Sequence, residues 1–164
     1  MNPLFDRHHV EHELGILRNA DRYPLRFLVG LDEWATLPDL VTYVGSVGAR
    51  GSVVARVVHV VELMGIPASF SLESVGEASA MVEEGTFLLR MSGVGAEGVV
   101  RNGRVDQIAR ILLEEGLAWH ADAIVLAARR TSGARRLLGR GVREQVLRRS
   151  SMTTVLVSPQ STSR

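Results

Sequence analysis

Residues 121–159 read ADAIVLAARRTSGARRLLGRGVREQVLRRSSMTTVLVSP, in which two apolar runs flank an arginine-rich loop and an amphipathic segment. The runs ADAIVLAA and TTVLVSP have the character of strands, and GVREQVLRR at 141–149 has helical spacing. A strand–loop–helix–strand unit can hold a phosphate, because free backbone N–H groups at a helix start face the anion and glycines allow its close approach. We expect Gly141 and Val142 to open that helix. Most loop positions where such a site needs glycine carry another residue here.

The alternation of strand and helix patterns extends back along the chain to residue 25. It predicts one α/β domain over 25–158 with a parallel, doubly wound sheet. The second and fourth expected strands are nearly continuous in apolar residues, as strands covered on both faces should be. The expected strands span 25–31, 53–61, 96–101, 122–128 and 153–158. The expected helices span 37–49, 75–90, 105–116 and 141–149.

Three helix ends carry recognisable signals. Thr36 with Asp39, and Ser74 with Glu77, have the spacing of a capping box, in which each side chain satisfies a free backbone N–H of the other residue. Gly116 is the expected stop of the third helix.

Composition excludes several chemistries. The chain has 164 residues and is 46% hydrophobic, which suits one domain with a substantial core. It contains no Cys, which excludes disulfides, thiolate nucleophiles and cysteine metal sites. All 19 of its basic residues are Arg, so there is no Walker-type or Schiff-base lysine.

Charge is unevenly distributed. Residues 129–149 contain eight Arg and one acid, Glu144, although the whole chain carries a net charge of only +1. Such a patch attracts anions, and Arg135, Arg136, Arg143 and Arg149 are candidates for a shared basic face. No aromatic residues alternate with these arginines for base stacking, so we expect no nucleic-acid partner.

Both ends of the chain lie outside the alternating pattern. Residues 1–24 form an N-terminal extension with an expected short helix, whose apolar face must cover either this domain or a partner. His8 and His12 would share a face of that helix, but no third fixed ligand is evident, so we expect no metal site. Residues 159–164 are an expected flexible tail. The chain shows neither a signal-peptide pattern nor an apolar run long enough for a membrane, so we expect a cytoplasmic protein with no membrane partner.

Asp32 is the first candidate site residue, because it closes the expected first strand, RFLVGLD. In doubly wound sheets, ligands bind beyond the carboxyl ends of the strands, where the strand order reverses. An acid at that place can accept hydrogen bonds from a ribose hydroxyl or a nucleobase amine. Its alternative role is to cap the segment that follows.

The motifs VGLD at 29–32, ADAIVLA at 121–127, SGARRLLGRGVREQVL at 132–147 and TTVLVSP at 153–159 together resemble the universal stress protein family. The resemblance covers residues 25–158. It implies a five-stranded sheet of the adenine nucleotide alpha hydrolase-like type, with strand order 3-2-1-4-5. It also implies a regulatory or protective role under stress. We expect no catalytic residues, with slow ATP hydrolysis as an alternative.

ATP-binding members of that family carry a loop written G-x2-G-x9-G-[ST] after a strand like A-D-L-I-V-M-G. By this resemblance the three glycine positions are Ala127, Arg130 and Arg140, and the hydroxyl position is Gly141, so all four depart from the pattern. Arg129 agrees with the pattern. An Arg that replaces glycine in a left-handed conformation costs roughly 1 kcal/mol or more.

We therefore expect no cofactor, and ATP or AMP binding is the alternative. The resemblance would place a nucleotide against Leu31, Asp32, Ala127, Arg129, Arg130, Gly133, Arg140, Gly141 and Val142.

The last strand predicts self-association. The implied strand order puts residues 153–157 at a sheet edge, and a long apolar edge is an aggregation hazard unless it is paired. In the family, two copies pair these strands across a two-fold axis, which buries both edges in one closed contact. We expect a homodimer through this strand; a protein adaptor that uses the N-terminal extension is a further alternative. The expected dimer residues are Thr153, Thr154, Val155, Leu156 and Val157.

Overall fold

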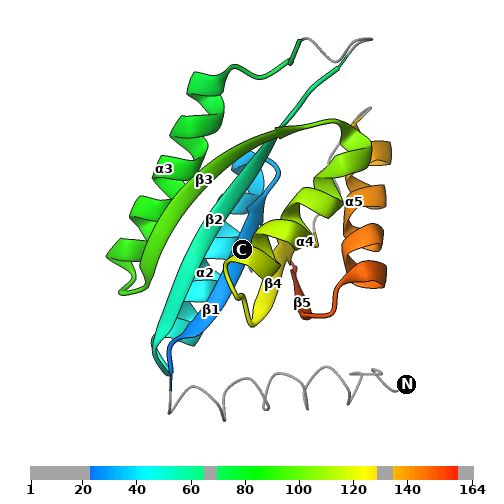
Figure 1. The fold of residues 1–164 in the computed structure, drawn as a ribbon. Helices are drawn as coiled ribbons and strands as arrows, with labels where there is room; N and C mark the ends of the chain where they lie inside the picture. The colour runs from blue at the N-terminus through cyan, green and yellow to red at the C-terminus, as the bar shows by residue number, and fades with distance from the viewer. Residues whose placement is uncertain (1–22, 65–69, 129–134, 159–164) are drawn as a thin grey trace, which may run out of the picture.

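The structure is a computed structural model that describes residues 23–64, 70–128 and 135–158, with only the backbone for 135–140. Five strands form a single parallel sheet in the order β3-β2-β1-β4-β5 (Figure 1). This confirms the expected fold class and strand order. The expected N-terminal helix and the tail at 159–164 lie outside the described residues. The strands are β1 Leu25–Leu31, β2 Val53–Glu62, β3 Gly95–Gly103, β4 Ala123–Ala127 and β5 Thr153–Val157.

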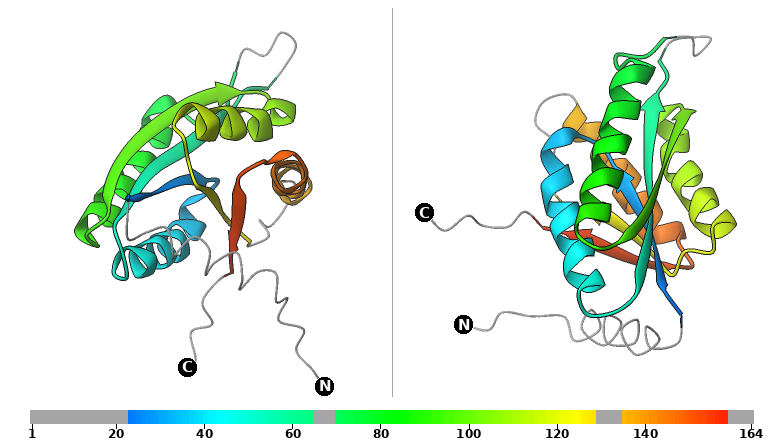
Figure 2. Two further views of the ribbon diagram at one scale, coloured as in Figure 1. Left: turned by 60° about the horizontal axis from the view of Figure 1, so that its bottom comes forward. Right: turned by 90° about the vertical axis from the view of Figure 1, so that its left-hand side faces the viewer.

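Helices cover both faces of the sheet (Figure 2). Side chains of α2 and α3 pack on one face, and those of α4 and α5 pack on the other. Short 3-10 turns, Trp34–Thr36 and Val105–Gln107, lead into α2 and α4. The helices are α2 Leu37–Gly48, α3 Val75–Met91, α4 Ile108–Ala118 and α5 Arg135–Arg149.

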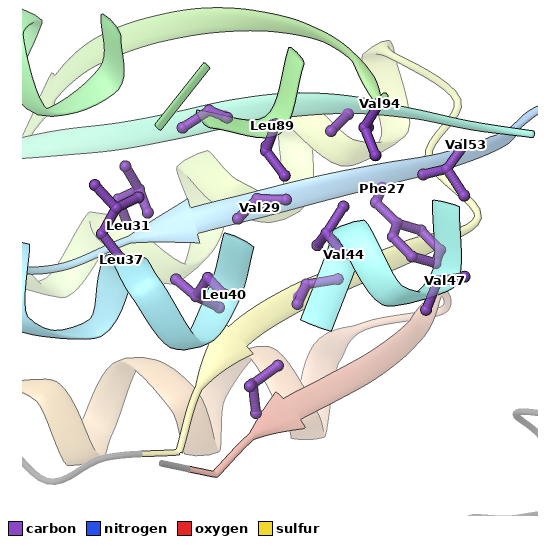
Figure 3. Close-up of a cluster of buried hydrophobic side chains, with 14 of the residues drawn as sticks. Phe27, Val29, Leu31, Leu37, Leu40, Val44, Val47, Val53, Leu89 and Val94 are labelled. Atoms are coloured by element: carbon purple, nitrogen blue, oxygen red, sulfur yellow. The ribbon is translucent and has the colours of Figure 1, made fainter. Parts of the chain in front are cut away.

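Each face of the sheet has its own hydrophobic core. Strands β1, β2 and β4 contribute buried side chains to both, which explains why their sequences are almost continuously apolar. The core under α2 and α3 is drawn in Figure 3 and includes Phe27, Val29, Leu40, Val44 and Leu89. The core under α4 and α5 includes Leu28, Val58, Leu112, Ile124 and Val146.

One of the two expected capping boxes is present. Ser74 Oγ accepts a hydrogen bond from the Glu77 backbone N–H at 3.1 Å, and Glu77 Oε2 accepts one from the Ser74 N–H at 2.8 Å. The box expected at Thr36 is wrong, because Thr36 has αR dihedrals and its side chain caps no backbone N–H. The preceding 3-10 turn already curves the chain there, whereas a capping side chain needs an extended backbone.

The last helix begins earlier than expected. We expected Gly141 and Val142 to open it, but α5 starts at Arg135 and Gly141 lies in its interior. Gly139 and Gly141 weaken a helix by about 1 kcal/mol each, yet the neighbouring Arg and Leu residues are good helix formers. Only the first four N–H groups of a helix lack an internal partner. The backbone at 141 and 142 therefore does not present the free N–H groups that the sequence suggested.

The third helix runs past its expected stop. Gly116 lies inside α4, which ends at Ala118. A Cβ at position 116 would lie 2.9 Å from Met152 Cε, so the glycine makes room for packing. The chain leaves the helix at His120, whose φ is 55°, with hydrogen bonds from the His120 N–H to the Leu117 oxygen and from the Ala121 N–H to the Gly116 oxygen. This is a Schellman motif with histidine in the position that usually holds glycine.

Candidate functional site

A cleft of about 270 Å³ opens at the carboxyl edge of the sheet. It is bounded by the ends of β1, β2 and β4, by the segment after β2, and by parts of α4 and α5. Strand order reverses between β1 and β4, so the cleft lies where doubly wound folds bind ligands. Its apolar walls include Val60, Ile108, Leu112, Leu126 and Val142.

Asp32 lies in this cleft, as expected, but both of its carboxylate oxygens are already engaged. Oδ1 is 2.8 Å from the Thr36 hydroxyl, and Oδ2 accepts a hydrogen bond from Arg143 Nη2 at 3.0 Å. The Thr36 hydroxyl also lies 2.9 Å from the Glu33 carbonyl oxygen, so its single hydrogen serves one acceptor at a time. Asp32 therefore ties the end of β1 to α5 and to the start of α2.

Arg143 is the functional-site residue that sequence reasoning missed. Its side chain is only 14% exposed and forms an ion pair with Asp32, which is 38% exposed. It is therefore not available to the basic face that the arginine cluster suggested. A signal was present: Arg143 precedes the buried Val146 by three positions, and residues three apart share a helix face. Nothing local, however, indicates that this face meets the end of β1.

His59 joins the sheet to the residues just before α3. The residue is 4% exposed; Nδ1 lies 3.0 Å from the Leu31 carbonyl oxygen, and Nε2 lies 2.6 Å from Glu73 Oε2. A carbonyl oxygen only accepts, so Nδ1 carries a proton in this contact. The histidine thereby satisfies a backbone acceptor at the end of β1. It also positions Glu73 at the cleft.

The rim of the cleft is apolar. After β2, Met64 pairs with Phe70 through backbone hydrogen bonds of 2.8 and 3.4 Å. Met64 and Leu72 line the cleft and are 37% and 73% exposed, and Phe70 beside them is 54% exposed. Met64 and Leu72 therefore add exposed apolar surface to an otherwise mixed cleft.

Four of the residues that the resemblance places against a nucleotide line the cleft: Leu31, Asp32, Ala127 and Val142. Gly141 lies beside Val142 in α5 but is not among the described lining residues. Outside the described residues lie Arg129, Arg130 and Gly133, together with the side chain of Arg140.

Within the described ranges, no three His, Asp or Glu side chains gather as a metal site would require. The expected pair His8 and His12 lies outside these ranges. Across the same described part of the chain, no helix has both the length and the apolarity to cross a membrane.

Comparison with known proteins decides the family. The model of the universal stress protein family matches residues 25–158. The chain belongs to the universal stress protein family. This confirms the resemblance drawn from the motifs, over the same range of residues. No curated protein matches the chain.

Solved universal stress proteins share the fold at low sequence identity. One from Archaeoglobus fulgidus, in complex with dAMP, is 16% identical with a TM-score of 0.63, covering 81% of this chain and 97% of its own. A second structure from Archaeoglobus fulgidus is 16% identical with a TM-score of 0.65, covering 82% and 99%. A universal stress protein in complex with cAMP is 19% identical with a TM-score of 0.59, covering 82% and 97%.

Proposed function

We propose that this universal stress protein is a dimeric regulatory or protective domain that does not bind ATP through the family's standard loop. The proposal rests on the surroundings of Asp32, because each of its two carboxylate oxygens already has a partner within the protein. These partners are Thr36 and Arg143. Each carboxylate oxygen can accept a second hydrogen bond. A ribose hydroxyl or an adenine amine would therefore have to share Asp32 with these donors, and the neighbouring Arg143 guanidinium already balances its charge, so Asp32 offers less to a nucleotide than a free carboxylate would.

The end of the loop supports the same proposal. Gly141 occupies the position at which ATP-binding members place a hydroxyl, and it lies within α5 rather than at the helix start. Ala127, at the first glycine position, is the last residue of β4 and is buried. Two contributions to phosphate binding, a side-chain hydroxyl and free N–H groups, are thus missing from residues 141 and 142.

Native mass spectrometry of freshly purified protein tests this proposal, followed by calorimetric titration with ATP. We expect a dimer without bound nucleotide and no heat of ATP binding. A co-purified mass of AMP or ATP, or a saturable heat, would overturn the proposal.

Adenine-nucleotide binding is the second candidate, and one observation favours it. The cleft persists at the carboxyl edge of the sheet, and similar folds have been solved with dAMP and with cAMP. In this alternative Asp32 exchanges its internal partners for the nucleotide. The same two experiments decide between the candidates.

The proposed dimer contact is the free edge of β5. The sheet has two edge strands, and only β5, with the sequence TTVLV, lacks charged residues. The other edge, β3, carries Glu97 and Arg101, and charges on an edge strand discourage pairing with another chain. Four of the five β5 residues are partly exposed, so a second copy would cover them.

Light scattering after size-exclusion chromatography tests the contact. We expect Thr154→Lys to yield monomers, because a lysine on an edge strand discourages pairing with another chain. Asn102→Lys, on the opposite edge strand β3, is the matched control and should remain dimeric. Circular dichroism must show that Thr154→Lys is folded. A folded Thr154→Lys protein that stays dimeric would rule out the β5 contact.

A further inference from the structure

We propose that the cleft binds an organic cation, a small molecule with an apolar body and one ammonium or guanidinium group directed at Glu62. This inference rests on the proposed function, because it requires that no nucleotide occupies the part of the cleft around Glu62. Two observations support the inference: a carboxylate of the described lining has no partner, and apolar side chains line the same cleft.

Among the charged residues of the described lining, Glu62 is the one whose side chain has no hydrogen-bond or ion-pair partner. It is the last residue of β2, it is half-buried, and it lines the cleft. Alternation along the strand places it on the same face as Val58 and Val60, which belong to the core under α4. Among the described residues its carboxylate forms no hydrogen bond or ion pair. A partly desolvated carboxylate without a partner is unfavourable, and a bound cation would relieve this.

The other charged residues of the described lining have side-chain partners. Asp32 is paired with Arg143, and Glu73 is in contact with His59. The described lining therefore holds three carboxylates against one guanidinium and one imidazole, which leaves at least one negative charge. The described lining therefore favours a cation over a phosphate.

The surfaces near Glu62 suit an apolar body. Val60, Ile108 and Leu112 form a wall, and Met64 and Leu72 form a partly exposed rim that a ligand would cover. Methionine adapts its shape to such partners. A volume of about 270 Å³ is at the small end for ligand pockets and suits a molecule of one or two rings.

Three probes that share an indole ring and differ in charge test the inference. Tryptamine is the cation, tryptophol the neutral alcohol and indole-3-propionate the anion. Calorimetry or NMR titration of the full chain, with probes at millimolar concentration, should show the order tryptamine, then tryptophol, then indole-3-propionate. Glu62→Gln should weaken tryptamine binding at least about tenfold, because a charge-assisted contact is lost.

Glu84→Gln is the control, since it makes the same change in charge at an exposed position of α3 outside the cleft. It should bind tryptamine like the unchanged protein. Glu62→Gln should unfold at the same temperature as the unchanged protein or at a slightly higher one, because the substitution breaks no side-chain hydrogen bond or ion pair among the described residues and removes a partly desolvated charge.

Several results would overturn the inference. One is that none of the three probes binds saturably. Others are that tryptophol binds as tightly as tryptamine, or that indole-3-propionate binds more tightly than tryptamine. A last one is that Glu62→Gln binds tryptamine with unaltered affinity. ATP is titrated separately. ATP binding together with Glu62-dependent tryptamine binding would overturn the proposed function and leave the acidic subsite supported. Absence of both would overturn only the cation inference.

Discussion

Asp32 has side-chain partners from two other parts of the chain. It stands at the end of β1, and its carboxylate oxygens lie within hydrogen-bonding distance of Thr36 and Arg143. Neither partner belongs to the loop motif that distinguishes ATP-binding members. The residue type at position 32 alone therefore does not report on ligand binding.

His120 is the one described residue other than glycine with a positive φ, at 55°. A left-handed conformation costs an L-residue roughly 1–2 kcal/mol, and glycine avoids this cost while gaining freedom in the unfolded chain. We expect His120→Gly to raise the free energy of unfolding by about 0.5–1 kcal/mol and His120→Val to lower it. Urea denaturation checks both variants. A less stable glycine variant would mean that the histidine ring contributes more than the strain.

At the scale of elements, the packing contacts of α4 explain where it ends. Trp119, just beyond the helix, is covered by two guanidinium groups: Arg26 lies 4.3 Å and Arg56 5.2 Å from the ring centroid. Arg26 Nε also donates a hydrogen bond to the Trp119 carbonyl oxygen at 2.9 Å. These long-range contacts hold the helix end at a place that local glycine signals did not indicate.

The start of α3 should make stability depend on pH. Hydrogen bonds from the backbone of Ser74, and then from its hydroxyl, hold the pKa of Glu77 below its usual range. The folded state therefore favours the carboxylate. The resulting stabilisation is present above the ordinary pKa and is lost as pH falls through the lowered one. Glu77→Gln keeps the box geometry but removes the titration.

We expect the stability difference between the unchanged protein and Glu77→Gln to shrink as pH falls from neutral to about 3. Urea midpoints measured across this range check it. Glu84→Gln, on the same helix without a capping contact, should show no such trend. A difference that stays constant with pH would contradict the assignment.

At the scale of the whole molecule, the Asp32–Arg143 pair joins parts of the chain that are 111 positions apart. It fastens α5 to the end of β1 across the cleft. Because Arg143 is largely buried and Asp32 is partly exposed, we expect a coupling of about 1 kcal/mol in unfolding free energy. A double-mutant cycle of Asp32→Asn and Arg143→Met measures it. Arg148→Met, on the exposed side of α5, is the control; a coupling near zero would show that the pair adds nothing.

The sequence by itself determined the fold class, the strand order through the family motifs, and most element boundaries. Burial on both faces of the sheet requires long apolar runs in β2 and β4, and such runs are visible in the sequence. The capping box at Ser74 depends only on residues three positions apart, so it is visible there too. It also placed Asp32 at the carboxyl edge of the sheet. These features are local, or they repeat a pattern shared by the family.

Only the tertiary structure decided which side chains meet in the cleft. Arg143 reaches Asp32, and His59 reaches Glu73, because strand order and helix packing bring distant segments together. Likewise, α5 starts at Arg135 and includes Gly139 and Gly141, although these glycines locally indicate a loop. Contacts between distant residues leave no periodic trace in one sequence. The charge balance among the described residues of the cleft therefore emerged only from the folded arrangement.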